Sequence, residues 1–283
     1  MILVTSAGGK SGRAIIKAFI AADQSVRALV RREDAAAELR EFGATETVIA
    51  DLSDRAALTS AMDGVDAVYY IAPNMMKDEK IFGDNMIAAA EAAGIDRFVF
   101  HSVLHTNVQA LAHHWARLSV EEVLIESRLD FTILQVSSYM QNMLPGWARM
   151  VETGIHAMAY EIDAPMSLVD LDDVAVAALR VVGDDGYAKG IFEIAGPVIT
   201  LREKAEILTR VLGRDVVAEK LPAETAIEHA RHAGVGEFGL ESMARMFAHY
   251  DKHGLVGSPK TLGWILGRAP TDFETFARRV ADA

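Results

Sequence analysis

The sequence predicts an α/β fold of the Rossmann type, a doubly wound parallel sheet accompanied by a smaller C-terminal lobe. Short, uniformly apolar segments alternate with alanine-rich helical segments through the first half of the chain, as in a parallel sheet covered on both faces. A cluster of glycines separates the first apolar segment from the first helical one. The chain has 283 residues, 51% of them hydrophobic, which is enough for a large core.

The alternation begins with an expected strand at Ile2–Thr5 and an expected helix at Arg13–Ala22. Right-handed crossovers between parallel strands would place successive helices on the two faces of the sheet. The further strands and helices expected are, in alternating order, Val26–Val30, Ala35–Phe42, Thr47–Ile49, Arg55–Met62, Ala67–Ile71, Phe82–Ala93, Phe98–Ser102, Trp115–Glu126 and Phe131–Leu134.

The pattern loosens after Pro145 and resumes near residue 166. We therefore expect residues 1–150 to form one domain and 151–283 a smaller lobe, with 166–196 returning to the main sheet. Trp147–Tyr160 is expected to begin as a helix and to become irregular. The later helices expected are Thr200–Gly213, Ala223–Ala233 and Thr271–Ala281. The expected loops are Gly234–Gly239 and Gly254–Pro259.

Composition excludes several classes of protein. The net charge of −12 disfavours a nucleic-acid or acidic-membrane partner. The absence of cysteine excludes disulfides, thiol catalysis and cysteine-ligated zinc, and no histidine pair has the His-Glu-x-x-His order, so we expect no metal. No signal peptide or membrane-length apolar run is apparent, so we expect a cytoplasmic protein, either monomer or homodimer.

The turn after the first strand reads Thr5-Ser6-Ala7-Gly8-Gly9-Lys10-Ser11-Gly12 and leads directly into a helix. Backbone N–H groups at a helix N-terminus favour a diphosphate, and glycine allows it to approach closely. The turn is not a nucleoside-triphosphate loop, because that motif requires a glycine where Val4 stands. It predicts a dinucleotide site.

Arg31 and Arg32 follow the second strand, where dinucleotide sites carry an acid for a ribose hydroxyl or a basic residue for a 2′-phosphate. A guanidinium binds a phosphomonoester through two parallel hydrogen bonds. The pair therefore favours NADP, although NAD stays possible if one arginine only pairs with Glu33 or Asp34.

Several motifs together resemble those of the NmrA-like branch of the atypical short-chain dehydrogenase/reductase superfamily, over nearly the whole chain. They are the Thr5-to-Gly12 turn, Arg31, Ala50-Asp51-Leu52, Phe98-Val99-Phe100-His101-Ser102, Glu121-x-x-Leu124-x-x-Ser127, the run from Ser167 to Ala175, and Phe192-Glu193-Ile194-Ala195-Gly196. The resemblance implies an NAD(P)-binding Rossmann lobe, with a small substrate lobe over the nicotinamide end.

Carried over by motif, the resemblance places Asp51 and Leu52 by the adenine, Ala72 and Pro73 by the ribose and diphosphate, and Ser102 near the nicotinamide. The chain departs from the family pattern at two positions. Ser6 replaces a glycine, which we expect the turn to tolerate only if Ser6 keeps a negative φ. Arg117 replaces a lysine; it keeps a charge for a ribose contact but cannot act as a base.

No Tyr-x-x-x-Lys pair, the usual proton-transfer device of the superfamily, is present. His113 and Arg117 lie one helical turn apart, and a neutral His113 beside the guanidinium is a candidate general acid, although His113 and His114 can equally just flank the helix. Tyr139, Gln141 and Asn142 are candidate binding residues, and Tyr139 is, with His113 and Arg117, also a candidate catalytic residue. The apolar side chains nearby could line a pocket for a flat aromatic substrate or could simply belong to the core; they are Met140, Met143, Trp147 and Met150.

Three functions fit these observations. The first is an NADP-dependent reductase of a small aromatic or quinone-like carbonyl compound, with a proton from His113 or water. The second is a non-catalytic NAD(P) sensor that signals redox state to a partner, as regulators of the resembled family do. The third is an aromatic polyketide hydroxylase, since some members resembling this chain are oxygenases.

Overall fold

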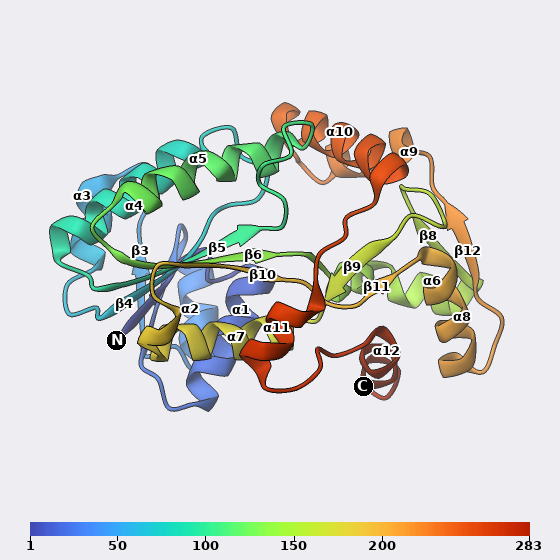
Figure 1. Cartoon of the computed structure of the whole chain (residues 1–283), viewed down its shortest axis with the longest axis horizontal. Helices are drawn as coiled ribbons and strands as arrows, with labels where there is room; N and C mark the ends of the chain where they lie inside the picture. The colour runs from blue at the N-terminus through green and yellow to red at the C-terminus, as the bar shows by residue number, and fades with distance from the viewer.

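The main sheet lies at the centre of the computed structural model, which describes residues 1–283 (Figure 1). Its seven strands are all parallel, in the order β10-β6-β5-β4-β1-β2-β3. The strands are β1 Ile2–Val4, β2 Val26–Val30, β3 Glu46–Ile49, β4 Ala67–Ile71, β5 Arg97–Val103, β6 Asp130–Val136 and β10 Gly190–Ile194. Because the chain winds outward from β1 in both directions, the predicted doubly wound Rossmann-type sheet is confirmed.

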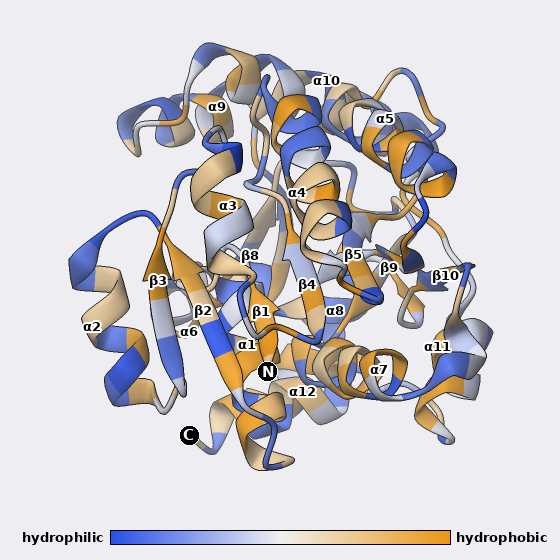
Figure 2. Ribbon diagram, turned by 90° about the vertical axis from the view of Figure 1, so that its left-hand side faces the viewer, coloured by the Kyte–Doolittle hydropathy of each residue, from blue (hydrophilic) through white to orange (hydrophobic).

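Helices cover both faces of this sheet, which explains why its strands are apolar throughout (Figure 2). Tyr69 and Ile71 of β4 face one core, and Val68 and Tyr70 face the other. The first core is closed by α1 Lys10–Ala21, α2 Glu33–Phe42, α7 Leu171–Gly183 and α11 Pro259–Leu266, and the second by α3 Arg55–Ala61, α4 Glu79–Ala93 and α5 Ala112–Glu126.

The small lobe has its own core and two small sheets beside the main one (Figure 1). One sheet contains β7 Ser138–Tyr139, β9 Met166–Val169 and β11 Val198–Ile199, and the other pairs β8 Ile155–Met158 with β12 Val217–Lys220. Besides α7 and α11, the second half of the chain contains the helical elements η1 Met140–Gly146, α6 Trp147–Thr153, η2 Asp185–Tyr187, α8 Leu201–Leu212, α9 Ala223–His232, α10 Glu237–His253 and α12 Phe273–Ala281.

The C-terminal half crosses between the two lobes several times. Strand β9 stays in the small lobe, whereas α7 packs on α1 and β10 joins the edge of the main sheet beside β6. Helix α11 returns as well, and contacts α7 and β10. Residues of both halves therefore meet above the carboxyl ends of the main strands.

Two local expectations differ from the structure. The expected loop Gly234–Gly239 ends earlier, because Gly236 caps α10 in an extended conformation (φ −72°, ψ 164°) and the helix starts at Glu237. The irregular part of Trp147–Tyr160 contains a strand, β8, whose pairing partner β12 lies about 60 residues later in the sequence.

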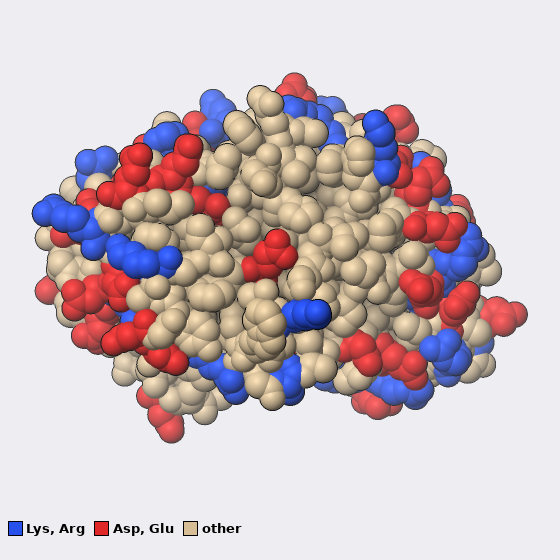
Figure 3. All heavy atoms as spheres, in the orientation of Figure 1, with Lys and Arg blue, Asp and Glu red and all other residues tan.

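The surface in the orientation of Figure 1 carries acidic and basic side chains interspersed around its edge, and its middle is mostly uncharged but broken by acidic and basic side chains near the centre (Figure 3). Helix α11 crosses this middle region in Figure 1, and its Trp264 is 76% exposed. None of the helices combines the length and the apolar character needed to cross a lipid bilayer.

Candidate functional site

Two cavities meet above the carboxyl ends of the strands and share Ser6, Gly9 and Pro73. We call the one that reaches Arg31 and Arg32 the outer pocket; its volume is about 630 Å³. We call the one between the lobes, which reaches His101 and Tyr139, the inner chamber; its volume is about 450 Å³. The shared residues make the two cavities a single groove.

The glycine turn forms the junction of the two cavities. Helix α1 starts after Gly9, has no side-chain cap, and carries no acidic residue in its first turn. Its first N–H groups and its dipole are therefore available to an anion in the groove. A Cβ on Gly12 would lie 2.5 Å from the Ser6 carbonyl oxygen and 2.7 Å from that of Ala7, so only glycine lets the helix pack this closely. This cradle fits a diphosphate.

Ser6 corrects one expectation from the sequence. Its φ is +47°, in the left-handed region, and not negative. The Ser6 hydroxyl donates a hydrogen bond of 2.8 Å to the carbonyl oxygen of Ile71 at the end of β4, which helps to hold a conformation that usually favours glycine. Thr5 also bonds to Ile71, through its hydroxyl, and lines neither cavity.

The two arginines after β2 are not equivalent. Both line the outer pocket, but Arg32 Nε pairs with Asp34 Oδ1 at 3.0 Å, the alternative that the sequence left open. Arg31 has no ion-pair partner and remains available to a ligand. Sequence reasoning missed Arg13, which also lines this pocket and pairs with Glu38.

Of the residues expected near the adenine and ribose, some line the two cavities and one does not. Leu52 lines the outer pocket, Ala72 lines the inner chamber, and Pro73 lines both. Asp51 lines neither cavity: its carboxylate accepts hydrogen bonds from the backbone N–H and the hydroxyl of Ser53, and these bonds, opposed by slight burial, lower its pKa.

The inner chamber is mainly apolar and is closed by residues that the sequence pattern does not group together. Helix α10 contributes Met246, Phe247 and Tyr250 from the far end of the chain. Further apolar side chains in its walls include Met75, Met158, Tyr160, Met166 and Leu255. Of the two alternatives for the nearby apolar residues, pocket or core, the structure shows the core: Met140, Met143 and Met150 are buried in the core of the small lobe, and Trp147 packs against that core.

His113 and Arg117 both lie on α5 and both line the chamber, as their spacing predicts. Burial, assisted by the charge of Arg117, lowers the pKa of His113 to about 4, so the imidazole is neutral at pH 7. Arg117 is itself occupied: its Nε lies 2.7 Å from Glu79 Oε1, and its Nη1 donates to the His101 carbonyl oxygen at 2.9 Å. Burial raises the pKa of Glu79 to about 7 against the pull of Arg117.

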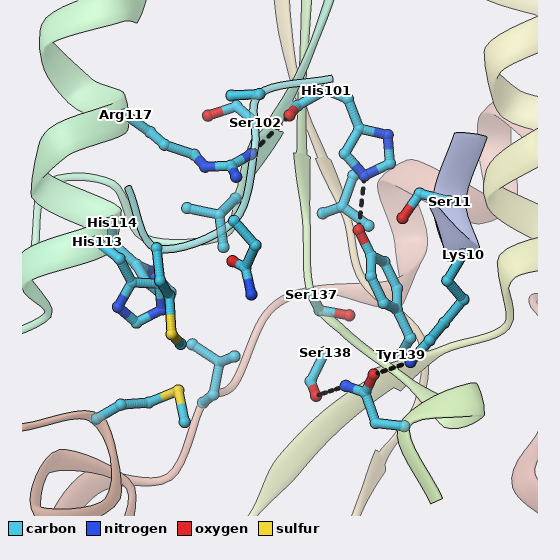
Figure 4. A pocket seen from close by; sticks show the side chains of 18 of the residues that line it. Lys10, Ser11, His101, Ser102, His113, His114, Arg117, Ser137, Ser138 and Tyr139 are labelled. Carbon is cyan, nitrogen blue, oxygen red and sulfur yellow. Dashed lines mark hydrogen bonds between the residues drawn. The ribbon is translucent and has the colours of Figure 1, made fainter. Parts of the chain in front are cut away.

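Tyr139 stands on the opposite wall of the chamber from His113 (Figure 4). Its hydroxyl lies 2.7 Å from His101 Nε2, and His101 Nδ1 lies 2.9 Å from the hydroxyl of Tyr69. Burial and the charge of Arg117 lower the pKa of His101 to about 3. This buried hydrogen-bonded chain was not apparent from the sequence, because its members come from β4, β5 and β7.

Other polar residues fix the walls of the chamber. Ser102 lines it, but its hydroxyl donates to the buried carboxylate of Glu121. Lys10 Nζ donates to Asn142 Oδ1 at 2.8 Å, which links the first turn of α1 to η1 across the groove, and burial lowers the Lys10 pKa. Ser11 and Asn142 also line the chamber, whereas Gln141 bonds to Asp170 and the N–H of Leu171.

Comparisons with known proteins agree with this architecture. The chain is 29% identical over 275 residues to quinone oxidoreductase 2 of Escherichia coli, covering 96% of this chain and 95% of that protein. It is 33% identical over 253 residues, 87% of this chain and 86% of that protein, to the (4-alkanoyl-5-oxo-2,5-dihydrofuran-3-yl)methyl phosphate reductase of Streptomyces griseus. The crystal structure of the NADPH-dependent quinone oxidoreductase of Escherichia coli with NADPH has a TM-score of 0.85, at 27% identity, and the match covers 99% of this chain and 100% of that chain.

The model of the NmrA-like family matches residues 1–277, nearly the entire chain. The resemblance inferred from the motifs is thereby confirmed: this chain belongs to the NmrA-like family.

Proposed function

We propose that this protein is an NADPH-dependent reductase of small, flat, aromatic or quinone-like carbonyl compounds. The observation that carries the proposal is the continuous groove. At one end it has an uncapped helix N-terminus and an unpaired guanidinium, and at the other an apolar chamber with hydroxyl and imidazole groups on its walls.

The outer pocket and the glycine turn suit the phosphates of NADPH. The N–H groups of Lys10, Ser11 and Gly12 would hold the diphosphate, and Arg31 would bind the 2′-phosphate. Leu52 and Pro73 offer apolar contact to the adenosine. Bound in this way, NADPH supplies a hydride at the entrance of the inner chamber.

The inner chamber suits a neutral flat ring. Of its two cationic side chains, Arg117 already pairs with Glu79, and Lys10 lies in the first turn of α1, where it donates to the neutral amide oxygen of Asn142 and would face the cofactor phosphates. Methionine and aromatic side chains provide adaptable apolar contact, and a chamber of about 450 Å³ is the size of a small-molecule site. A conjugated carbonyl substrate is supported by the two relatives named above, a quinone oxidoreductase and a (4-alkanoyl-5-oxo-2,5-dihydrofuran-3-yl)methyl phosphate reductase.

The test is consumption of NADPH by the purified protein in the presence of para-quinones, aromatic aldehydes and aliphatic ketones, followed by the loss of absorbance. We expect turnover with the quinones and little with the aliphatic ketones. NADPH binding without consumption across the whole panel would contradict the proposal and favour a sensor.

A pair of variants separates the chamber from general effects on the fold. Phe247→Ala removes a buried chamber wall and should raise the KM for the quinone about tenfold, with an unchanged dissociation constant for NADPH. Val217→Ala, on the exposed strand β12, is the control and should change neither value.

A further inference from the structure

We propose that Tyr139 is the proton donor of the reaction, and that the buried residues His101 and Tyr69 hold its hydroxyl in the donating orientation. This inference rests on the proposed function. The proton then comes from Tyr139, on the chamber wall opposite His113, and His101 and Tyr69 are positioning residues behind that wall.

The three side chains form a chain of hydrogen bonds from the core to the chamber. Tyr69 on β4 and His101 on β5 lie on neighbouring parallel strands, and both belong to the face of the sheet that packs on α1. The Tyr69 hydroxyl lies 2.9 Å from His101 Nδ1. On the other side of the ring, His101 Nε2 lies 2.7 Å from the Tyr139 hydroxyl (Figure 4).

The direction of the first bond follows from burial. Tyr69 is fully buried, and His101 Nδ1 is the one hydrogen-bond partner of its hydroxyl. A buried O–H group without an acceptor is costly, so Tyr69 donates its proton to Nδ1. His101 Nδ1 is then an acceptor and carries no proton.

The second bond follows from the charge of His101. With its pKa lowered to about 3, the ring is neutral and carries one proton, which must be on Nε2. His101 Nε2 therefore donates to the oxygen of Tyr139. The O–H of Tyr139 is not used in this bond, and it is free to donate to a ligand in the chamber that Tyr139 lines.

Tyr139 is also in the correct protonation state to act as an acid. Burial raises its pKa, against the opposing effects of Ser11 and Arg117, so the phenol keeps its proton at neutral pH. His113 differs in that its Nδ1 is buried without a hydrogen-bond partner, and no hydrogen bond within the protein fixes the ring in one orientation.

The step balances as follows. The acceptor gains a hydride, with its two electrons, from the nicotinamide ring, and its carbonyl oxygen gains the proton as the Tyr139 O–H bond breaks. Water in the groove then returns a proton to the Tyr139 oxygen. His101 and Tyr69 keep their own protons, because Tyr69 has no outlet to solvent, so both are positioning residues.

Four variants test these roles in the presence of a quinone that the wild type reduces. Tyr139→Phe should lower kcat about 100-fold, whereas His113→Gln should lower it less than threefold. Tyr69→Phe should lower kcat about threefold although Tyr69 does not line the chamber. Tyr70→Phe is the matched control: it is the adjacent buried tyrosine, its hydroxyl has no partner, and kcat should not change.

Replacement of His101 gives a rescue experiment. His101→Gln presents an amide oxygen to Tyr69 and an N–H to Tyr139, and should retain most of the wild-type kcat, whereas His101→Leu should lose about tenfold or more. The dissociation constant for NADPH should stay within twofold of the wild type in every folded variant.

A second readout needs neither substrate nor turnover. Nitrogen-15 NMR of the free protein at pH 7, assigned with His101→Gln, should show a protonated Nε2 and a bare Nδ1. A protonated Nδ1 would overturn the inference, because Tyr139 would then have to donate to His101. Full activity of Tyr139→Phe would overturn it too, while leaving the proposed function intact; absence of turnover in the wild type would instead remove the proposed function.

Discussion

The two ends of the groove are built in different ways. The outer end depends on residues close together in the sequence, from Ser6 to Gly12 and at Arg31. The inner chamber is assembled from both halves of the chain, with Pro73 on one side and Tyr250 of α10 on another. The proposed phosphate site thus needs only the first strand, turn and helix and the end of the second strand, whereas the chamber exists only when the small lobe has folded against the sheet.

The two ends also differ in electrostatics. Arg31 is an exposed charge without an ion-pair partner, which suits recognition of a phosphate. In the chamber, burial keeps His101 and His113 neutral, and Glu79 pairs with Arg117. Under the proposed function, the outer end would select its ligand by charge and the inner end by shape and hydrogen bonding.

The largest effect is expected at the junction. Gly12→Ala places a Cβ within 2.7 Å of two backbone oxygens, so α1 must move away from the turn, and the dissociation constant for NADPH should rise at least about 100-fold. Titration by fluorescence measures this, with circular dichroism to show that the variant is folded. Gly183→Ala has open space around its Cβ and is the control. Unchanged NADPH binding by Gly12→Ala would show that the turn does not hold the phosphates.

The next effect tests the charge of the outer end. Arg31→Ala removes a charge-assisted contact, so affinity for NADPH should fall about 30-fold while affinity for NADH changes little. Arg32→Ala should have a much smaller effect, because Arg32 already pairs with Asp34. Equal losses for NADPH and NADH, measured by calorimetric titration, would refute the assignment of the 2′-phosphate to Arg31.

A third prediction concerns the neutral inner end and pH. Burial lowers the pKa values of His101, His113 and His114 to about 3, 4 and 2. Below pH 6.5, the ordinary histidine pKa, these side chains take up protons in the unfolded chain but stay neutral in the folded protein. Stability is therefore present above pH 6.5 and is lost as the pH falls. Glu79, with its pKa raised to about 7, and Glu121, whose pKa burial also raises, act in the opposite direction, whereas the buried His156, with its pKa lowered to about 3, adds to the loss.

The free energy of unfolding should therefore fall by more than about 1 kcal/mol per pH unit between pH 6 and 5. Urea denaturation at pH 7, 6 and 5 measures it. His113→Gln should make this dependence shallower, and the exposed His229→Gln should not. A free energy of unfolding that does not change over this range would mean that the chamber histidines are not buried as described.

The smallest effect is expected at Ser6. Ser6→Ala keeps the left-handed conformation and loses the hydrogen bond to Ile71, so it should destabilise the protein by about 1 to 2 kcal/mol. Ser6→Gly loses the same bond but relieves the strain, so its cost should be about 1 kcal/mol smaller. Denaturation of the two variants compares them directly, and a more stable Ser6→Ala would contradict the strain at this position.

The sequence predicts the outer end well, because its signals are local. The spacing of Ser6, Gly9 and Gly12 between a strand and a helix, and the position of Arg31 after the next strand, require no long-range information. One local detail was still wrong, the φ of Ser6, because the hydrogen bond that supports it comes from Ile71, 65 residues away.

The chamber could be predicted only in part. Spacing within one helix brings His113 and Arg117 together, and Tyr139 follows a strand as expected. The bond between His101 and Tyr139, and the closure by α10, depend on strand register and lobe packing, which leave no pattern in the sequence. For the same reason the sequence does not decide whether the methionines nearest to Tyr139 line the chamber or face the core; Met140 and Met143 face the core.

The central claim, that one groove holds NADPH from Arg31 to Tyr139, is tested most directly by a crystal structure of the protein with NADPH. We predict phosphate density at the N-terminus of α1, the 2′-phosphate on the guanidinium of Arg31, and the nicotinamide ring at the entrance of the chamber. A groove that stays empty at saturating NADPH, or a cofactor whose 2′-phosphate points away from Arg31, would contradict the claim.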